Sequence, residues 1–139
     1  MTTLWVRPAG MMNAKLFFMG KTDLKKIKKL IENNPVVVAT VLDRKFPNAV
    51  VVAFVKVISG GEVLITDNYL NQTIKDLKQN NNACLLVWND EEEGYKIIGR
   101  AQYFKSGKWK KAVEEIKENK GLPAKGAILV KVKKIIKLS

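Results

Sequence analysis

The chain has 139 residues, 47% hydrophobic and 27% charged, which is enough for one domain with a core and too short for two. It contains no His and one Cys, Cys84, so Ser-His-Asp triads, Cys-His pairs, His-ligated metals, zinc clusters and disulfide frameworks all lack parts. No apolar run approaches the roughly 20 residues that span a bilayer. We therefore expect a cytoplasmic protein from a reducing compartment.

The formal net charge of +12 is unevenly distributed along the chain. Residues 21–45 carry +4 and residues 108–139 carry +7, whereas residues 46–107 carry −1. Of the 25 cations 22 are Lys, although base-edge readout and bidentate phosphate recognition depend on Arg. The composition favours a solvated Lys-rich surface over a sequence-specific DNA-binding face. A non-catalytic, Lys-rich barrel that binds nucleic acid or another polyanion is the alternative.

The N-terminal part predicts an arm and one helix. Residues 1–20 are expected to form an N-terminal arm that can be flexible. One domain is expected over residues 21–139. An apolar stripe at helical spacing predicts an amphipathic helix over residues 22–33. Pro35 ends this helix, because proline disfavours helical geometry in the residue before it.

Three closely connected apolar runs follow, at residues 36–42, 49–58 and 63–66. They predict three consecutive strands in an antiparallel meander. The second run is apolar at both odd and even positions, so neither of its faces is typical of a solvated surface. One face is expected to join the core, and the other needs a helix, a ligand or a second subunit to cover it.

The middle of the chain predicts a second helix and a hairpin. A polar loop at residues 67–73 leads into a helix that carries Ile74 and Leu77 and ends at Asn80. Two apolar runs then follow, at residues 83–89 and 95–105, with an acidic turn between them, and together they predict a hairpin.

The C-terminal part predicts a third helix and a last strand. Gly99, inside the second strand of the hairpin, indicates a bulge or a close backbone approach. Residues 108–120 show helical spacing of apolar residues, and the final strand alternates until Lys133, where a bulge or strand end is expected. The predicted class is mainly β with peripheral helices (α+β), an antiparallel barrel of about six strands and three helices, because a doubly wound sheet needs more crossover helices.

The order of these elements resembles the pyridoxamine 5'-phosphate oxidase-like FMN-binding split-barrel family. The resemblance runs from about Asp23 to Lys137, and its carriers are residues 35–41, 46–57, 67–77, 83–88 and 94–101. It implies an antiparallel split β-barrel. It also implies a homodimer with FMN at the subunit interface and a role as a flavin-dependent oxidoreductase or electron-transfer flavoprotein. It identifies no catalytic residue, and we expect neither a membrane nor a metal nor, on this reading, nucleic acid as a partner.

The resemblance also implies which residues hold the cofactor. Those expected along the isoalloxazine and ribityl chain or bordering the site are Val51, Val52, Ala53, Phe54, Thr66, Asp67 and Asn68. The phosphate is expected at Gln72 and Thr73, where family members commonly have Lys-Thr or Lys-Ser. Thr73 stands at a helix start, where free amides favour an anion, whereas Gln72 brings no charge. Lys45, Lys75 or Arg100 could replace the missing cation.

Structural roles stay open for several of these residues. Val51 and Val52 could be plain core, and Thr73 could be an N-cap, since capping and phosphate binding need the same geometry. A structural dimer whose cofactor site has decayed is a third hypothesis, which the uncharged Gln72 suggests. Oxidation of pyridoxine phosphates is not expected, because the family's true oxidases often use Arg and His contacts to the substrate phosphate.

Overall fold

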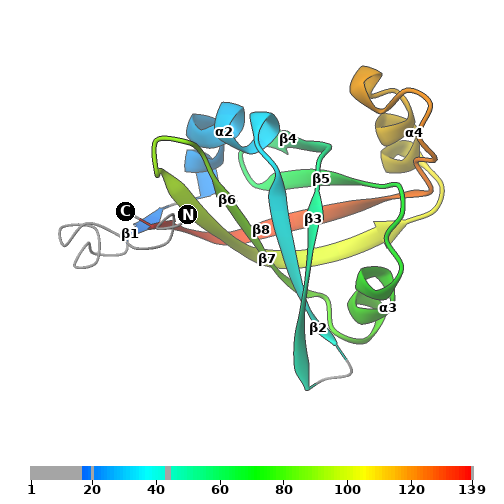
Figure 1. Cartoon of the computed structure of the whole chain (residues 1–139), viewed down its shortest axis with the longest axis horizontal. Helices are drawn as coiled ribbons and strands as arrows, with labels where there is room; N and C mark the ends of the chain where they lie inside the picture. The colour runs from blue at the N-terminus through cyan, green and yellow to red at the C-terminus, as the bar shows by residue number, and fades with distance from the viewer. Residues whose placement is uncertain (1–16, 20, 43–44, 139) are drawn as a thin grey trace.

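An antiparallel sheet that coils into a split β-barrel forms the framework of the computed structural model, which describes residues 17–19, 21–42 and 45–138 (Figure 1). Its strands are β1 (Phe17–Met19), β2 (Val36–Leu42), β3 (Phe46–Val52), β4 (Val55–Ser59), β5 (Glu62–Asp67), β6 (Asn82–Trp88), β7 (Gly94–Phe104) and β8 (Gly126–Leu138). Seven of them follow the path β3-β2-β6-β7-β8-β5-β4, and β1 pairs with β8. The predicted class is confirmed, with more strands than the six expected.

Three helical regions lie at the periphery of the sheet, as the sequence predicts. They comprise the 3-10 helix η1 (Lys21–Ile27), α2 (Lys28–Asn33), α3 (Gln72–Gln79), α4 (Lys108–Glu114) and the 3-10 helix η2 (Lys117–Asn119). The first predicted helix therefore begins as a 3-10 helix, and the third ends earlier than expected and continues as a separate turn. Figure 1 shows α2 near β4, α3 below the barrel next to β2, and α4 at the far end of β8. None of the helices in the described residues is long and apolar enough to cross a membrane.

The predicted strand over residues 49–58 is wrong, because the chain bends at Ala53 and Phe54. β3 pairs with β2 and β4 pairs with β5, so the two halves of that run lie at opposite ends of the strand path. A bend that passes a strand from one sheet layer to another is how such barrels form a corner. The expected three-strand meander is therefore two separate hairpins.

The barrel interior is filled by side chains that alternate along the strands. β2 buries Val36 and Val38 and leaves the residues between them half-buried, and β6 repeats this pattern. The apolar stripe of the first helical region contributes Leu24 and Ile31. A second, smaller cluster forms where Val113 of α4 packs against β5 and β8. It consists of Leu64, Val113, Ala124, Ala127 and Leu129.

A β-bulge interrupts the pairing of β7 with β8, as predicted from Gly99 and Lys133. Ile98 pairs with Lys134 and Gly99 pairs with Val132, so Lys133 is the extra residue. A Cβ atom on Gly99 would lie 2.3 Å from the backbone oxygen of Lys131. Only glycine therefore permits the close approach of the two strands at this point.

We expect Gly99→Ala to destabilise the fold by about 3 kcal/mol, because the added methyl group collides with rigid backbone. Gly94→Ala is the matched control, since a Cβ there would meet its nearest atom at an ordinary 3.6 Å. It should change the free energy of unfolding by less than about 0.5 kcal/mol. Urea denaturation of both variants measures the difference, and equal midpoints would contradict the close approach.

Candidate functional site

A cavity of about 320 Å³ lies where the chain bends between β3 and β4. It is lined by Val50, Val51, Val52, Ala53, Phe54, Thr66, Asn68, Tyr69, Leu70 and Leu122. The lining comes from the bend, the end of β5, the loop after it and a distant segment before β8. Most of the walls are apolar, and a small number of polar groups is what a site for a flat organic ligand needs.

The structure brings six of the nine expected cofactor residues into this lining. They are Val51, Val52, Ala53, Phe54, Thr66 and Asn68. Val52 is buried, whereas Val51 is 62% exposed on the other side of β3. Asp67, Gln72 and Thr73 do not line the cavity.

Thr66 is the polar group in this lining that lacks a partner. Its side chain is buried, with 4% of its surface exposed, and its Oγ1 has no hydrogen-bond partner within the part of the chain that the structure describes. Its backbone N–H donates to the carbonyl oxygen of Phe54 at 3.1 Å. An unpaired buried hydroxyl costs about 1–3 kcal/mol, so it is the kind of atom that a ligand satisfies.

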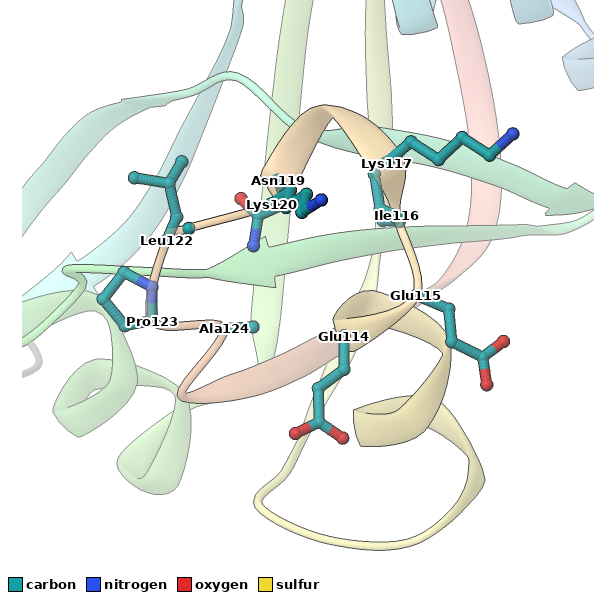
Figure 2. Close-up of a pocket in the computed structure, with 10 residues that line it drawn as sticks. Glu114, Glu115, Ile116, Lys117, Asn119, Lys120, Leu122, Pro123 and Ala124 are labelled. Carbon is teal, nitrogen blue, oxygen red and sulfur yellow. The ribbon is translucent and has the colours of Figure 1, made fainter.

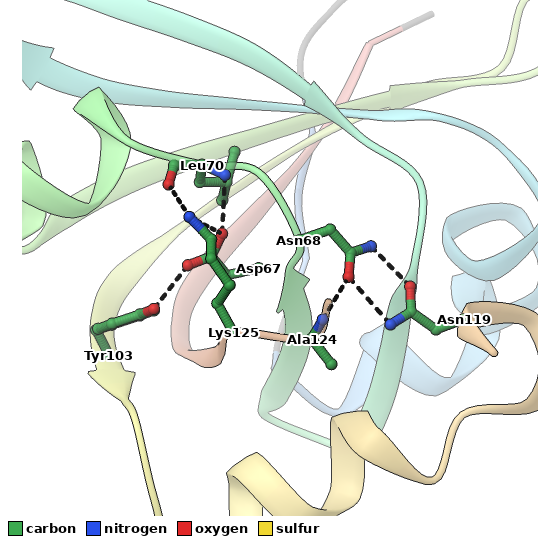
Figure 3. Close-up of polar contacts among 7 residues, drawn as sticks. All are labelled: Asp67, Asn68, Leu70, Tyr103, Asn119, Ala124 and Lys125. Carbon is green, nitrogen blue, oxygen red and sulfur yellow. Dashed lines mark hydrogen bonds and ion pairs between the residues drawn. The ribbon is translucent and has the colours of Figure 1, made fainter. Parts of the chain in front are cut away.

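Asp67 has a structural role in the loop that borders the cavity (Figure 3). Its carboxylate accepts hydrogen bonds from the Tyr103 hydroxyl at 2.6 Å and from the backbone N–H of Leu70 at 2.8 Å. Lys125 lies 3.9 Å from the same carboxylate, which is 1% exposed. A Cβ atom on Gly126 would lie 2.3 Å from the Tyr103 hydroxyl oxygen, so glycine leaves room for this contact.

The expected phosphate position, at the start of α3, contains a buried carboxylate. Asp76 is 1% exposed and accepts hydrogen bonds from the Gln72 amide and from the Thr40 hydroxyl, both at 2.8 Å. Asn48 donates to the Thr40 and Thr73 hydroxyls at 3.3 Å each. One hydrogen of the Gln72 amide is therefore donated to Asp76. The Thr73 hydroxyl accepts from Asn48, and its own hydrogen can still be donated.

The first turn of α3 has free backbone donors. Asn71, the residue before the helix, makes no side-chain capping hydrogen bond. The backbone N–H groups in the first turn of any α-helix have no acceptor within the helix. That Lys45, Lys75 or Arg100 replaces the missing cation stays a prediction. Within the described residues no hydrogen bond or ion pair joins any of the three to Gln72 or Thr73.

Lys56 and Cys84 lie outside the cavity lining. Lys56 on β4 forms an ion pair with Glu118 at 3.8 Å. Burial raises the pKa of the Cys84 thiol above its ordinary value, although the charge of Lys96 opposes this shift. A protonated thiol is a poor nucleophile. The described residues contain no cluster of three metal-ligating side chains.

A larger cavity of about 420 Å³ lies on the other side of the segment 116–124 (Figure 2). Its lining mixes acidic Glu114 and Glu115 with basic Lys117 and Lys120, and it contains no buried polar atom without a partner. Leu122 lines both cavities, so this segment is the wall between them. The smaller cavity is the better candidate site, because it alone combines apolar walls with the unpaired Thr66 hydroxyl.

The sequence analysis missed four residues of the lining. Val50, Tyr69 and Leu70 are neighbours of residues it identified, so a wider window would have included them. Leu122 follows the third helix and reaches the cavity only through tertiary structure. No local sequence signal could have identified it.

Residues 24–139 match the family model described as pyridoxamine 5'-phosphate oxidase. An uncharacterized protein of Methanocaldococcus jannaschii is 32% identical over 118 residues, with 82% of this chain and 79% of the relative covered. The match to the family model includes β2 to β8 and therefore the whole cavity.

Two solved structures show the same fold. HupZ from Group A Streptococcus has a TM-score of 0.72 at 23% identity, covering 80% of this chain and 90% of HupZ. An FMN-binding protein from Syntrophomonas wolfei subsp. wolfei has a TM-score of 0.70 at 20% identity, covering 84% of this chain and 86% of that protein.

We expect Tyr103→Phe to cost about 1–2 kcal/mol of stability near neutral pH, because it removes a partly exposed hydrogen bond to the Asp67 carboxylate. Burial first, and then this hydrogen bond, raise the pKa of the Tyr103 phenol in the folded state. The contribution is therefore complete below pH about 10, where an unfolded tyrosine ionises, and is lost as the pH rises above it. Denaturation of wild type and variant from pH 7 to 11 measures this. The difference between their free energies of unfolding should become smaller as the pH rises above about 10.

Tyr69→Phe is the matched control, since Tyr69 is 73% exposed. It should change stability by less than about 0.5 kcal/mol at every pH. A gap for Tyr103→Phe that widens above pH 10 would contradict the assigned contact.

Proposed function

The chain belongs to the pyridoxamine 5'-phosphate oxidase family, and we propose that it binds FMN in the cavity at the β3–β4 bend and acts as a flavin-dependent oxidoreductase or electron-transfer flavoprotein. One observation carries the proposal: an apolar cavity of about 320 Å³ is lined in part by Thr66, whose buried hydroxyl has no partner in the described residues. The fold shared with an FMN-binding protein supports the same cofactor.

The cavity fits the chemistry of an isoalloxazine ring. The apolar side chains of Val52, Ala53 and Leu70 offer walls for a flat aromatic system. The Thr66 hydroxyl can donate to or accept from the heteroatoms at the edge of the ring. Backbone groups at Ala53, which is outside the strand ladder, are further donors and acceptors. The polar groups that the cavity offers to the ring are therefore few, and they lie at Thr66 and Ala53.

The flavin phosphate is proposed at the start of α3. The free amides of the first turn and the Thr73 hydroxyl would donate to it, and the positive end of the helix dipole favours an anion there. Gln72 Nε2 donates one hydrogen to Asp76 and could donate its second hydrogen to the phosphate. The proposed phosphate site therefore offers neutral donors where family members commonly have Lys, and Lys45, Lys75 or Arg100 could add the missing charge.

The flavin, when bound, supplies hydride or single-electron transfer, so the protein needs no acid-base side chain of its own. The apolar walls exclude water from the ring, and the Thr66 hydroxyl holds a proton at the ring edge. Asp67 keeps the neighbouring loop in place through Leu70. Oxidation of pyridoxine phosphates is not part of the proposal, because neither Arg nor His lines the described cavity.

The outer face of the sheet supports a homodimer. We use the term outer apolar face for the outward residues of β3, β2, β6 and β7 that pair across the strands: Val37, Ala39, Ala49, Val51, Cys84, Leu86 and Ile98. All keep part of their surface exposed in the single chain. Contiguous exposed apolar surface of this kind marks an interaction site. Val51 belongs to this face and to the cavity lining, so a second copy docked here would also cover the cavity.

We expect the purified protein to take up FMN and to show the visible absorption of a bound flavin. Thr66→Val should have two opposite effects. It should stabilise the flavin-free protein, because it removes an unpaired buried hydroxyl, and weaken FMN binding about tenfold, because it removes a ligand contact. Thermal unfolding of the flavin-free protein and fluorescence titration with FMN measure the two effects.

Ser59→Val, at a half-buried hydroxyl that already has partners, is the control and should leave FMN affinity unchanged. A wild type that binds no FMN would overturn the proposal. Retention on DNA without flavin would point to the polyanion-binding alternative, and release of a deazaflavin would correct the cofactor.

We expect Val37→Glu to convert a dimer into a monomer, because Val37 pairs with the apolar Val51 and Leu86 and a charge there cannot be buried unpaired. Ile58→Glu is the matched control: Ile58 is 40% exposed on β4, outside that face, so this variant should stay dimeric. Size-exclusion chromatography with light scattering gives the masses. A monomeric wild type, or a dimeric Val37→Glu protein, would contradict the proposed interface.

A further inference from the structure

A pair of asparagines joins the loop after β5 to the wall segment before β8 (Figure 3). Asn68 Nδ2 donates to Asn119 Oδ1 at 2.7 Å, and Asn119 Nδ2 donates to Asn68 Oδ1 at 3.1 Å. The backbone N–H of Ala124 donates to the same Asn68 oxygen at 2.9 Å. Asn119 is 3% exposed, and it does not line the candidate cavity.

The third hydrogen bond fixes which way both amides point. An amide pair alone could be reversed by flipping both groups, because each has one donor side and one acceptor side. The N–H of Ala124 can only donate, so it must face the oxygen of Asn68. Asn119 must then present its own oxygen to Asn68 Nδ2 and its nitrogen to Asn68 Oδ1.

This arrangement leaves Asn68 with one unused group, and that group is a donor. Its oxygen accepts two hydrogen bonds, whereas its nitrogen carries two hydrogens and donates only one of them within the described residues. Asn68 lines the candidate cavity. A ligand there therefore meets a donor from this side chain, and the matching group on the ligand is a carbonyl oxygen or an unprotonated ring nitrogen.

We infer that Asn119 is a positioning residue for the bound flavin, because it holds Asn68 as a hydrogen-bond donor to an acceptor atom on the isoalloxazine ring. The inference rests on the proposed FMN site and adds a residue to it that has no contact with the cavity. A donor at an acceptor atom that gains electron density on reduction stabilises the reduced flavin. Asn119 therefore acts on the redox potential through Asn68.

The contact between Asn68 and Asn119 (Figure 3) also holds the segment 116–124, which lies between the two cavities and lines the one drawn in Figure 2. The Leu122 N–H donates to the Asn119 carbonyl oxygen at 3.0 Å, and Leu122 lines both cavities. Ala124 has a φ of 45°, in the left-handed region that residues other than glycine rarely adopt. Asn119 is thus also expected to stabilise this segment. The experiment below separates that structural role from the positioning of Asn68.

Asn119→Ala tests the inference in the FMN-loaded protein, with Lys120→Ala as the matched control in the same segment. Lys120 is exposed and its side chain makes no contact with Asn68. The two readouts are the dissociation constant for FMN and the midpoint potential of the flavin at saturating FMN. We expect Asn119→Ala to bind FMN about tenfold more weakly, as the loss of one ordered hydrogen bond predicts, and to shift the midpoint potential to a more negative value. Lys120→Ala should match the wild type in both.

The potential at saturation distinguishes positioning from simple destabilisation. A protein that is merely less stable binds less flavin, but the flavin that it does bind keeps the wild-type potential. A wild-type potential in saturated Asn119→Ala would therefore overturn the inference. A wild type that takes up no flavin would instead overturn the proposed function, so the two failures are distinct.

Asn68→Asp gives a second test that leaves the Asn119 side chain itself in place. It keeps an oxygen for the Ala124 and Asn119 donors but replaces the whole amide nitrogen by an acceptor, so the unused N–H is lost together with the hydrogen bond to Asn119 Oδ1. We expect the same negative shift of the potential and at least the same tenfold loss of affinity. An unchanged potential in this variant would show that Asn68 is not the donor, even if Asn119→Ala fails to fold.

Discussion

The bend at Ala53 and Phe54 is the constraint on which both the cavity and the outer apolar face depend. Ahead of it the chain pairs with β2, and after it the chain pairs with β5, so the two ends of the strand path separate at this point. The backbone groups of the bend leave the ladder, and the Thr66 N–H satisfies the Phe54 carbonyl at 3.1 Å. The gap that the bend opens is lined by whatever side chains the two hairpins carry there.

Much of the fold follows from the sequence because its signals are local. The apolar stripe around Leu24 and Ile31 and the bulge at Gly99 and Lys133 are visible in short windows, and the structure confirms them. The bend is different. Residues 49–58 are apolar throughout, which predicts one continuous strand, and only the pairing of each half with a different partner reveals the break. Pairing partners lie outside any local window.

The candidate site divides in the same way. Val51, Val52 and Thr66 could be predicted from their places in the element order, and the structure brings them to one cavity. Leu122 could not, because it reaches the cavity only after α4 packs against β5 and β8, and Asn119 is joined to the lining only through its hydrogen bond with Asn68. A lone Asn in a Lys-rich segment carries no sequence signal. Its meaning depends on a partner 51 residues away.

The distribution of charge along the sequence is a weak guide to the proposed phosphate position. The positive excess lies in residues 21–45 and 108–139, whereas residues 46–107, which supply nine of the ten cavity residues, carry −1. Asp76 adds a buried carboxylate beside the first turn of α3, with only neutral donors around it in the described residues. Such a group repels a phosphate and takes one hydrogen of the Gln72 amide, whereas the helix amides and Thr73 attract one. In the proposed FMN complex these opposing effects assign the larger share of the affinity to the ring in its apolar cavity.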